Sequence, residues 1–156
     1  MTPAVKQLKK LSIPYNLHQY QHDTDCKSFG LEAVEKLQVS PNSVFKTLVV
    51  DVDNRYLAVA VIPVKEKLSL KKLAKILQSK KVKMANENKV ENSTGYILGG
   101  VSPLGQKKRL ITILDQSAES LDSLFISGGK RGLEIELSPQ NLVITSQASY
   151  ANITID

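Results

Sequence analysis

The spacing of apolar residues predicts three helices, which begin after Thr2, near residue 29 and after Ser69. Thr2 followed by Pro3 is typical of a helix start, because the side chain caps the first turn and proline fits its first position. Residues 29–37 show the same periodicity. The third helix is rich in lysine, and we expect its buried stripe to be Leu70, Leu73, Ala74 and Leu77.

Alternating and β-branched runs predict strands through most of the remaining chain. A short strand is expected over 15–20. Two longer runs, 44–52 and 55–62, are separated by Asp53-Asn54, which indicates a hairpin. Further strands are expected over 96–98, 110–114, 124–127 and 133–137. A last element begins at Ser138-Pro139, and we expect a helix there, although residues 143–145 also suit a strand.

This order of elements favours an α+β fold. Strands outnumber helices late in the chain, and the 156 residues contain no internal repeat or linker. We therefore expect one domain over 1–156, with a mixed, barrel-like β-sheet flanked by helices.

The charge of the chain favours a polyanionic partner. Lys and Arg number 21 against 15 Asp and Glu, which gives a formal net charge of +6. Nucleic acid is the commonest partner of such proteins, although an excess of surface lysine can serve solubility alone. The lysines over 65–83 have the same two interpretations: the wet side of a helix, or a surface that follows an RNA backbone.

The sequence predicts a cytoplasmic protein with no membrane segment. Cys26 is the single cysteine, so no disulfide can form within the chain. No apolar leader stands at the amino terminus, and the longest apolar run, 57–64, contains Pro63 and is too short to cross a bilayer.

Two segments, 93–109 and 127–132, each place a glycine pair beside a group of Lys and Arg. Glycine allows the main chain to approach a ligand closely and to direct N–H groups toward it. The neighbouring cations suit phosphate. We therefore expect the two loops to form two walls of one pocket for a phosphate-bearing ligand.

Lys46 is the first candidate for chemistry, because strand alternation places it on the same face as Val44, Leu48 and Val50. A lysine on an apolar face is costly unless its ammonium group reaches solvent or a partner. It is either a lysine that reaches past the strand to solvent or a positive charge directed into a pocket, where it could bind phosphate or an oxyanion.

The sequence offers no convincing serine triad, metal site or cofactor motif. Ser127 ends a strand before a turn, but no histidine follows it in the chain. Ser127 is therefore more plausible as a group that orients a ligand. His18, His22 and Cys26 have no companions at metal-ligand spacing, and no phosphate-binding nucleotide motif is present, so we expect no metal and no cofactor.

Alternation also predicts that Glu134 and Glu136 point away from the core, on a solvated strand face. Tyr20 and Phe29 lie in or beside turn-rich segments. Each could stack on a base or pack into the core.

Several segments resemble the bacterial YbaK-type cysteinyl-tRNA(Pro) deacylases. They are 1–5, Phe29-Gly30, Phe45-Lys46-Thr47-Leu48, 93–96, 99–109 and 127–133. The match runs nearly end to end, and the wider superfamily includes the editing domain of bacterial prolyl-tRNA synthetases. The resemblance implies an α/β fold with a barrel-like sheet and hydrolysis of the ester that joins a wrong amino acid to tRNA.

The resemblance also implies roles for residues. Lys46 would hold the terminal phosphate and adenosine of the tRNA, while Gly99 and the segment Ser127-Gly128-Gly129 would surround the ester. We expect the substrate to contact Tyr20, Phe29, Thr47, Gly100, Lys130 and Glu134. Glu134 stands where the family often carries the shorter Asp.

For a cysteinyl ester the thiol of the substrate can itself attack the carbonyl, which leaves the enzyme to fix geometry and stabilise the oxyanion. The expected partners are mischarged cysteinyl-tRNA(Pro) and, in a transient complex, prolyl-tRNA synthetase. Two alternatives stay open: a deacylase of another mischarged tRNA such as alanyl-tRNA(Pro), and a non-catalytic RNA-binding module.

Overall fold

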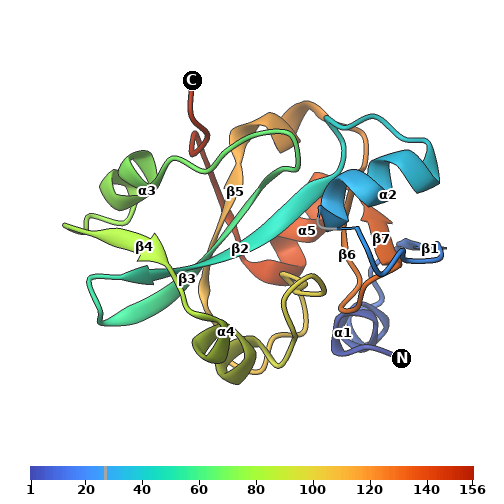
Figure 1. The fold of residues 1–156 in the computed structure, drawn as a ribbon, viewed down its shortest axis with the longest axis horizontal. Helices are drawn as coiled ribbons and strands as arrows, with labels where there is room; N and C mark the ends of the chain where they lie inside the picture. Colours follow the sequence, from blue (N-terminus) through green and yellow to red (C-terminus); the bar gives the residue numbers. More distant parts are fainter. Residues whose placement is uncertain (27) are drawn as a thin grey trace.

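The strands form two sheets in the computed structural model, which describes residues 1–26 and 28–156 (Figure 1). The larger sheet has the order β4 (Val82–Met84), β2 (Phe45–Val52), β3 (Tyr56–Pro63), β5 (Ile111–Asp115) and β8 (Ser149–Ala151). The smaller sheet has the order β1 (Asn16–Gln19), β7 (Leu133–Leu137) and β6 (Leu124–Ser127).

The expected α+β class with a mixed sheet is confirmed. In the larger sheet β2 and β3 are antiparallel, whereas β5 runs parallel to both β3 and β8. The sheet is less barrel-like than expected, because the described strands divide into two sheets. One parallel bridge between Val44 and Phe125 connects them, supported by the Phe125 amide, which donates to the Ser43 carbonyl at 2.8 Å.

Polar side chains fix the starts of three helices. Thr2, Ser69 and Ser138 each accept a hydrogen bond from the amide three residues ahead, at 3.3, 3.1 and 3.1 Å. The capping predictions are thus confirmed, and the element after Ser138 is a helix. The helices are α1 (Pro3–Lys10), α2 (Phe29–Leu37), α3 (Leu70–Ile76), α4 (Glu87–Thr94) and α5 (Pro139–Ser146), with a 3-10 turn over Gln116–Ser120. None of them, within the described residues, has the length and apolar character needed to cross a membrane.

The predicted hairpin is also confirmed. Asp53 and Asn54 both adopt a φ of 54°, a left-handed conformation that these two residue types tolerate. The Asp53 carboxylate then accepts the Lys81 amide at 2.6 Å, which attaches β4 to the hairpin edge. The chemistry of the turn therefore fixes the register of the two longest strands.

Apolar residues from both sheets share one core. Phe45 and Val61 of the larger sheet pack with Ile126 and Ile135 of the smaller one, together with Leu8 of α1. A second cluster lies between the larger sheet and α3, where Leu73 is buried and its expected companions are partly buried: Leu70, Ala74 and Leu77. The predicted stripe of the third helix is therefore correct.

Helix α2 covers the other face of the smaller sheet. Ala33 of α2 packs in one cluster with Phe125 of β6, Val44 and Val64, and Val34 and Leu37 lie against it. The smaller sheet is consequently covered on both faces near α2. This coverage explains why Glu134, described below, is buried.

One predicted strand is wrong. Residues 96–98 form a loop, because Gly95 and Gly99 on either side have φ values of 82° and 89°. Tyr96 is instead buried, and its hydroxyl donates to the Leu104 carbonyl at 2.6 Å. No sequence signal predicted β4 and β8, which have three residues each, or α4, which is mostly polar.

Gly105 and Gly95 provide a test of loop packing. Both have positive φ, but a Cβ at Gly105 would lie 2.4 Å from the Pro3 carbonyl carbon, whereas at Gly95 the nearest atom would be 3.7 Å away. We expect Gly95→Ala to lower the free energy of unfolding by about 1–2 kcal/mol, the cost of the left-handed backbone. Gly105→Ala should lower it by about 2–5 kcal/mol, because overpacking adds to that cost. Urea unfolding measures both, and equal losses would contradict this packing.

Candidate functional site

A cavity of about 400 Å³ lies between the start of α2, the first half of β2 and two glycine-containing loops. Most of the predicted site residues line it: Tyr20, Phe29, Lys46, Thr47, Gly99, Ser127, Lys130 and Glu134. Arg131, one of the second-loop cations expected to suit phosphate, also lines it. Val101 and Leu48 line it as well, although sequence reasoning gave them no role in the site. We refer to this cavity as the main cavity.

Lys46 is held in the wall of the main cavity by β2, where it pairs with Ile62 of β3. Partial burial lowers the pKa of its ammonium group, with a smaller opposing effect from Glu66. Among the described residues, Lys46 makes no ion pair. Its charge is therefore available to a ligand.

Thr47, the next residue along β2, also lines the main cavity. Its buried hydroxyl oxygen has no hydrogen-bond partner among the described residues. A buried polar atom without a partner is costly in a folded protein. Because this oxygen is buried, a ligand in the main cavity can supply the missing hydrogen bond only after the Thr47 side chain turns toward it.

The expectation that Glu134 points away from the interior is wrong. Glu134 is 7% exposed and lines the main cavity. It lies on the face of the smaller sheet that also carries Ser127 and Phe125, since Ser127 is its direct neighbour on β6. Helix α2 packs on that face through Phe125, so neither face of β7 is fully solvated here.

Burial gives Glu134 unusual acid–base properties. Desolvation raises the pKa of its carboxyl group to about 8, so the group is mainly neutral at pH 7. Glu136, two residues further along the strand, has a lowered pKa: hydrogen bonds from Ser123 and His18, at 2.7 and 2.9 Å, outweigh its partial burial. Desolvation, with Glu134 nearby, likewise raises the pKa of Tyr20 to about 12. Because the Glu134 carboxyl group is mainly neutral, the charged side chains in the wall of the main cavity are the cations Lys46, Lys130 and Arg131.

Gly99 allows the two loops and α2 to meet. The guanidinium carbon of Arg131 lies 4.2 Å from the centre of the Phe29 ring, and its Nη2 donates to the Leu98 carbonyl at 3.1 Å. A Cβ at Gly99 would lie 2.6 Å from both the Arg131 Nε and the Phe29 Cε2, at a φ of 89°. A larger residue would therefore separate Phe29 from Arg131.

A hydrogen-bonded pair, His22 and Glu32, supports Phe29 from behind. The His22 ring lies 5.4 Å from the Phe29 ring, and its Nδ1 lies 2.5 Å from a Glu32 carboxylate oxygen. Burial alone would raise the pKa of Glu32, but the Asp23 amide and His22 outweigh it and lower the pKa.

The remaining predicted glycines form the loops without lining the main cavity. Gly100 packs against the Lys130 backbone, and its amide donates to the Ile97 carbonyl at 2.9 Å. The Gly128 amide donates to Leu133, and the Gly129 amide to the Ser127 hydroxyl, at 2.8 and 3.1 Å. These three amides are already used, whereas the Gly99 amide makes no hydrogen bond among the described residues.

The described residues of the main cavity contain no nucleophile paired with a base. Ser127 accepts from Gly129, while His18 and His22 are paired with Glu136 and Glu32. Cys26 lies outside the cavity lining, and its thiol contacts the Ser28 carbonyl at 3.4 Å. Within the described part of the chain, no cluster of three or more His, Cys, Asp and Glu could hold a metal ion.

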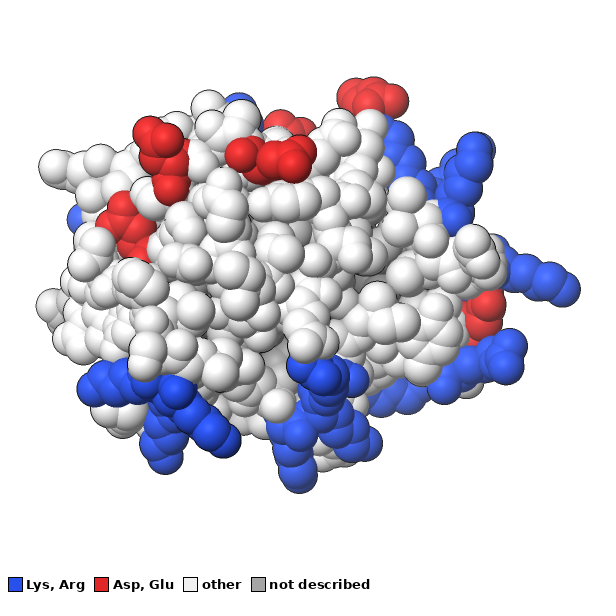
Figure 2. Space-filling model, turned by 180° about the vertical axis from the view of Figure 1, so that it is seen from behind, with Lys and Arg blue, Asp and Glu red and all other residues white. Residues whose placement is uncertain are grey.

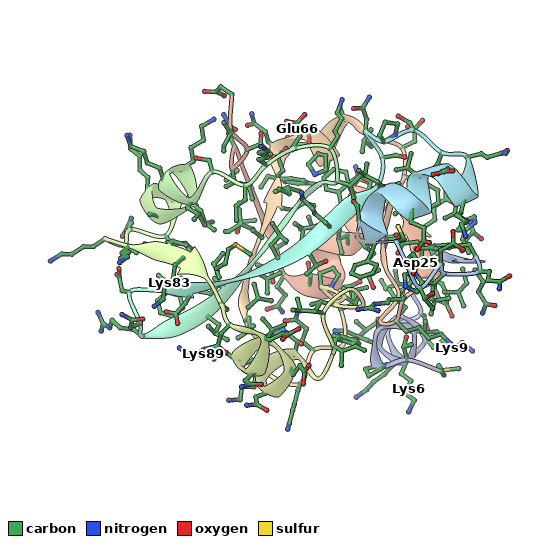
Figure 3. The ribbon with its side chains drawn as sticks, in the orientation of Figure 1. Lys6, Lys9, Asp25, Glu66, Lys83 and Lys89 are labelled. Atoms are coloured by element: carbon green, nitrogen blue, oxygen red, sulfur yellow. The ribbon has the colours of Figure 1, made fainter. Side chains whose placement is uncertain are left out.

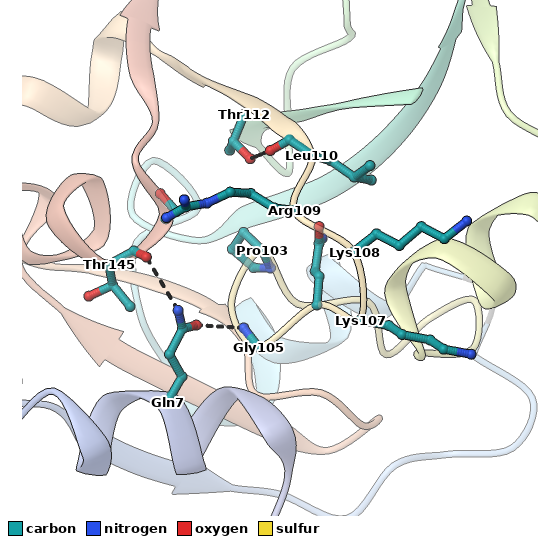
Figure 4. Close-up of a pocket in the computed structure, with 11 residues that line it drawn as sticks. Gln7, Pro103, Gly105, Lys107, Lys108, Arg109, Leu110, Thr112 and Thr145 are labelled. Atoms are coloured by element: carbon teal, nitrogen blue, oxygen red, sulfur yellow. Dashed lines mark hydrogen bonds between the residues drawn. The ribbon is translucent and has the colours of Figure 1, made fainter. Parts of the chain in front are cut away.

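The first loop does not contribute its cations to the main cavity. Gly99 and Val101 line the main cavity, but residues 105–109 line a second cavity of about 290 Å³ that also contacts α1 and α5 (Figure 4). Both loops therefore form walls of one pocket, as predicted, but the expectation that the first loop brings its cations to that pocket is wrong. Lys130 and Arg131 of the second loop supply cations to the main cavity, together with Lys46.

Comparison with known proteins identifies the family. The sequence model of the aminoacyl-tRNA editing domain matches residues 25–144. A protein of Enterococcus faecalis (strain ATCC 700802 / V583), the proposed Cys-tRNA(Pro)/Cys-tRNA(Cys) deacylase EbsC, is 37% identical over 153 residues, which cover 98% of this chain and 93% of that protein.

Solved structures share this fold. The hypothetical protein APE2540 superposes with a TM-score of 0.87 at 25% identity, over 99% of this chain and 100% of that one. A proposed trans-editing enzyme for prolyl-tRNA synthetase has the same fold, with a TM-score of 0.87 at 19% identity, over 100% of this chain and 99% of the other. The chain belongs to the aminoacyl-tRNA editing domain family. It is thus an aminoacyl-tRNA deacylase, an enzyme of translation fidelity, as its resemblance to the YbaK-type proteins implied.

The buried carboxyl group of Glu134 predicts how stability depends on pH. The folded protein binds this proton more tightly than the unfolded chain, so its contribution is fully present below pH 4.5 and is lost as pH rises through about 8. We expect the free energy of unfolding to fall between pH 5 and pH 9, and Glu134→Gln to reduce that fall. Urea unfolding at pH 5, 7 and 9 measures it.

Glu136→Gln is the matched control, because its pKa is shifted in the opposite direction. Loss of that carboxylate should lower stability but leave the fall between pH 5 and pH 9 in place. An unchanged fall in Glu134→Gln would show that this carboxyl group is already ionised at pH 7.

Proposed function

We propose that this deacylase hydrolyses cysteinyl-tRNA(Pro) and that the substrate thiol is the nucleophile. The observation that carries the proposal is a main cavity with cationic walls but, among its described residues, no side-chain nucleophile paired with a base. The name of the Enterococcus relative supports the choice of amino acid.

In this proposal the terminal phosphate and adenosine of the tRNA lie near Lys46, Lys130 and Arg131, whose charges suit phosphate. Thr47 offers its unpaired hydroxyl group to the same ligand. The ester lies beside Gly99 and Ser127. The Gly99 amide is the best candidate for oxyanion stabilisation, since the amides of Gly128 and Gly129 are already used within the loop.

The reaction then needs no acid or base of unusual strength. The substrate sulfur forms a bond to its own carbonyl carbon, and the bond from that carbon to the ribose oxygen breaks. The proton of the thiol passes to the ribose oxygen, and the cyclic thioester is opened by water to give cysteine. A thiol of ordinary pKa, about 8.5, is a few per cent thiolate at neutral pH.

This chemistry supplies a selectivity that the size of the cavity cannot. A pocket distinguishes side chains that differ by one small group by only about 1–3 kcal/mol. Alanyl-tRNA(Pro) fits wherever the cysteinyl ester fits, but it has no thiol and cannot follow this path. Nucleophile and specificity determinant would then be the same sulfur atom.

Residues 1–156 would act as one editing domain. Prolyl-tRNA synthetase, bound in a transient complex, would select the tRNA on which this domain acts. A small protein has little surface with which to read a whole tRNA, which supports the need for such a partner. The cytoplasm, where a lone cysteine such as Cys26 stays reduced, is the compartment we propose.

Lys46→Ala tests the role of the main cavity. We expect hydrolysis of cysteinyl-tRNA(Pro) to slow by about 100-fold or more, the usual effect of removing a group that stabilises transition-state charge. Lys67→Ala is the matched control, because Lys67 acts on Lys46 only through its charge and is itself exposed. The measurement is release of labelled cysteine. Equal rates in the two variants would exclude Lys46 from the site.

A comparison of esters tests the nucleophile. Cysteinyl-tRNA(Pro) should be hydrolysed at least 100-fold faster than seryl-tRNA(Pro), because a hydroxyl group is almost un-ionised at neutral pH and is a much weaker nucleophile than a thiolate. Cys26→Ala should leave both rates unchanged, since Cys26 lies outside the cavity lining. Comparable rates for the two esters would rule out attack by the substrate thiol, and hydrolysis of neither would favour a module that only binds RNA.

A further inference from the structure

The cations of the first loop lie outside the main cavity, around a second cavity that α1 also borders. Lys107, Lys108 and Arg109 line the second cavity, and so does Gln7 of α1. Lys6 and Lys10 are exposed on α1 and, four residues apart, share one face of that helix. We define the basic edge as Lys6, Lys10, Lys107, Lys108 and Arg109.

Backbone hydrogen bonds hold the basic edge in place. The amides of Lys107 and Lys108 donate to the carbonyls of Thr94 and Ser93 at the end of α4, at 3.0 and 2.9 Å. The Gly105 amide donates to the Gln7 side chain at 2.6 Å (Figure 4). The loop cations therefore extend from a fixed backbone, and α1 is attached directly to that loop.

The charges of the basic edge are not neutralised within the chain. Among the described residues, none of its five cations forms an ion pair. No Asp or Glu lines the second cavity. A different cavity, lined by Lys80 and Lys81, contains Asp53, whose carboxylate accepts both of their amides.

The distribution of charge over the surface agrees. Figure 2 shows Lys and Arg side chains along the lower edge and at the right-hand end of one face, with most of the Asp and Glu side chains in its upper half. Helix α1 lies at that lower edge, where Figure 3 labels Lys6 and Lys9. A one-sided charge distribution of this kind attracts an extended polyanion more strongly than the net charge of +6 alone would suggest.

The loop cations divide into two parts. In Figure 4 the Arg109 side chain extends toward Thr145 near the end of α5, where the helix dipole places partial negative charge. The side chains of Lys107 and Lys108 extend in the opposite direction. Arg109 is thus partly compensated by the helix end, and the two lysines carry most of the charge that is free for a ligand.

We propose that the basic edge binds the phosphodiester backbone of RNA, at a site separate from the main cavity. Lysines on flexible stems contact phosphate oxygens as point charges and carry no sequence information. The identity of the RNA rests on the proposed function: it is the body of the tRNA whose aminoacylated end enters the main cavity. The basic edge supplies affinity, and the main cavity supplies chemistry.

The test compares two double variants that remove the same charge. Lys107→Gln/Lys108→Gln changes the basic edge, and Lys80→Gln/Lys81→Gln changes two exposed lysines beside Asp53. Binding of uncharged tRNA(Pro) is measured by fluorescence anisotropy between 50 and 200 mM NaCl, after thermal unfolding has shown that both variants are folded.

We expect the basic-edge variant to bind more weakly and its slope of log affinity against log salt to be less steep by about 2, roughly one for each lost phosphate contact. The control variant should keep a slope close to that of the wild type. Equal slopes and affinities in the two variants would overturn the inference.

A second substrate separates this inference from the proposed function. A cysteinyl ester of the trinucleotide CCA can occupy the main cavity without an RNA body. If the wild type hydrolyses neither this ester nor cysteinyl-tRNA(Pro), the proposed function fails, while the effect on tRNA binding still supports the basic edge. If both esters are hydrolysed and the two double variants bind tRNA equally, the basic edge alone is excluded.

Discussion

The close approach of two loops and a helix at Gly99 determines the shape of the site. Because this position has no side chain, Phe29 of α2 and Arg131 of the second loop can stack on each other directly over the first loop. The contact connects three segments far apart in sequence, and His22 and Glu32 support it from behind. The main cavity lies beneath this contact, so its walls depend on one residue that contributes only backbone.

The same packing explains the electrostatics. When α2 covers the smaller sheet it buries Glu134 and raises the pKa of that carboxyl group to about 8, which removes a negative charge from the main cavity. Lys46, Lys130 and Arg131 then dominate the cavity walls. A carboxylate with an ordinary pKa would repel the phosphate of an acceptor end, whereas a neutral carboxyl group can donate a hydrogen bond to it.

The sequence predicted the fold well where local chemistry decides the structure. The caps Thr2, Ser69 and Ser138 and the Asp53-Asn54 turn are local signals, and each was correct. The motif residues that meet in the main cavity were also found. Two of the predictions that failed, the outward position of Glu134 and the placement of the first-loop cations, depended on long-range packing.

Strand alternation placed Glu134 outside because it cannot show that α2 covers the second face of β7. Proximity in sequence suggested that Lys107, Lys108 and Arg109 share a pocket with Gly99. In the structure, Gly99 and Val101 line the main cavity, whereas the three cations line the second cavity. The loop over 96–98 was misjudged because apolar residues between two glycines look like a strand, while positive φ at both glycines prevents one.

The most direct test of this account is to bind an amide analogue of cysteinyl-adenosine, in which nitrogen replaces the ester oxygen, and to follow backbone NMR shifts. The account predicts the largest shifts at Lys46, Thr47, Gly99 and Lys130, with little change over residues 105–109. Shifts concentrated in residues 105–109, with Lys46 and Gly99 unaffected, would contradict it.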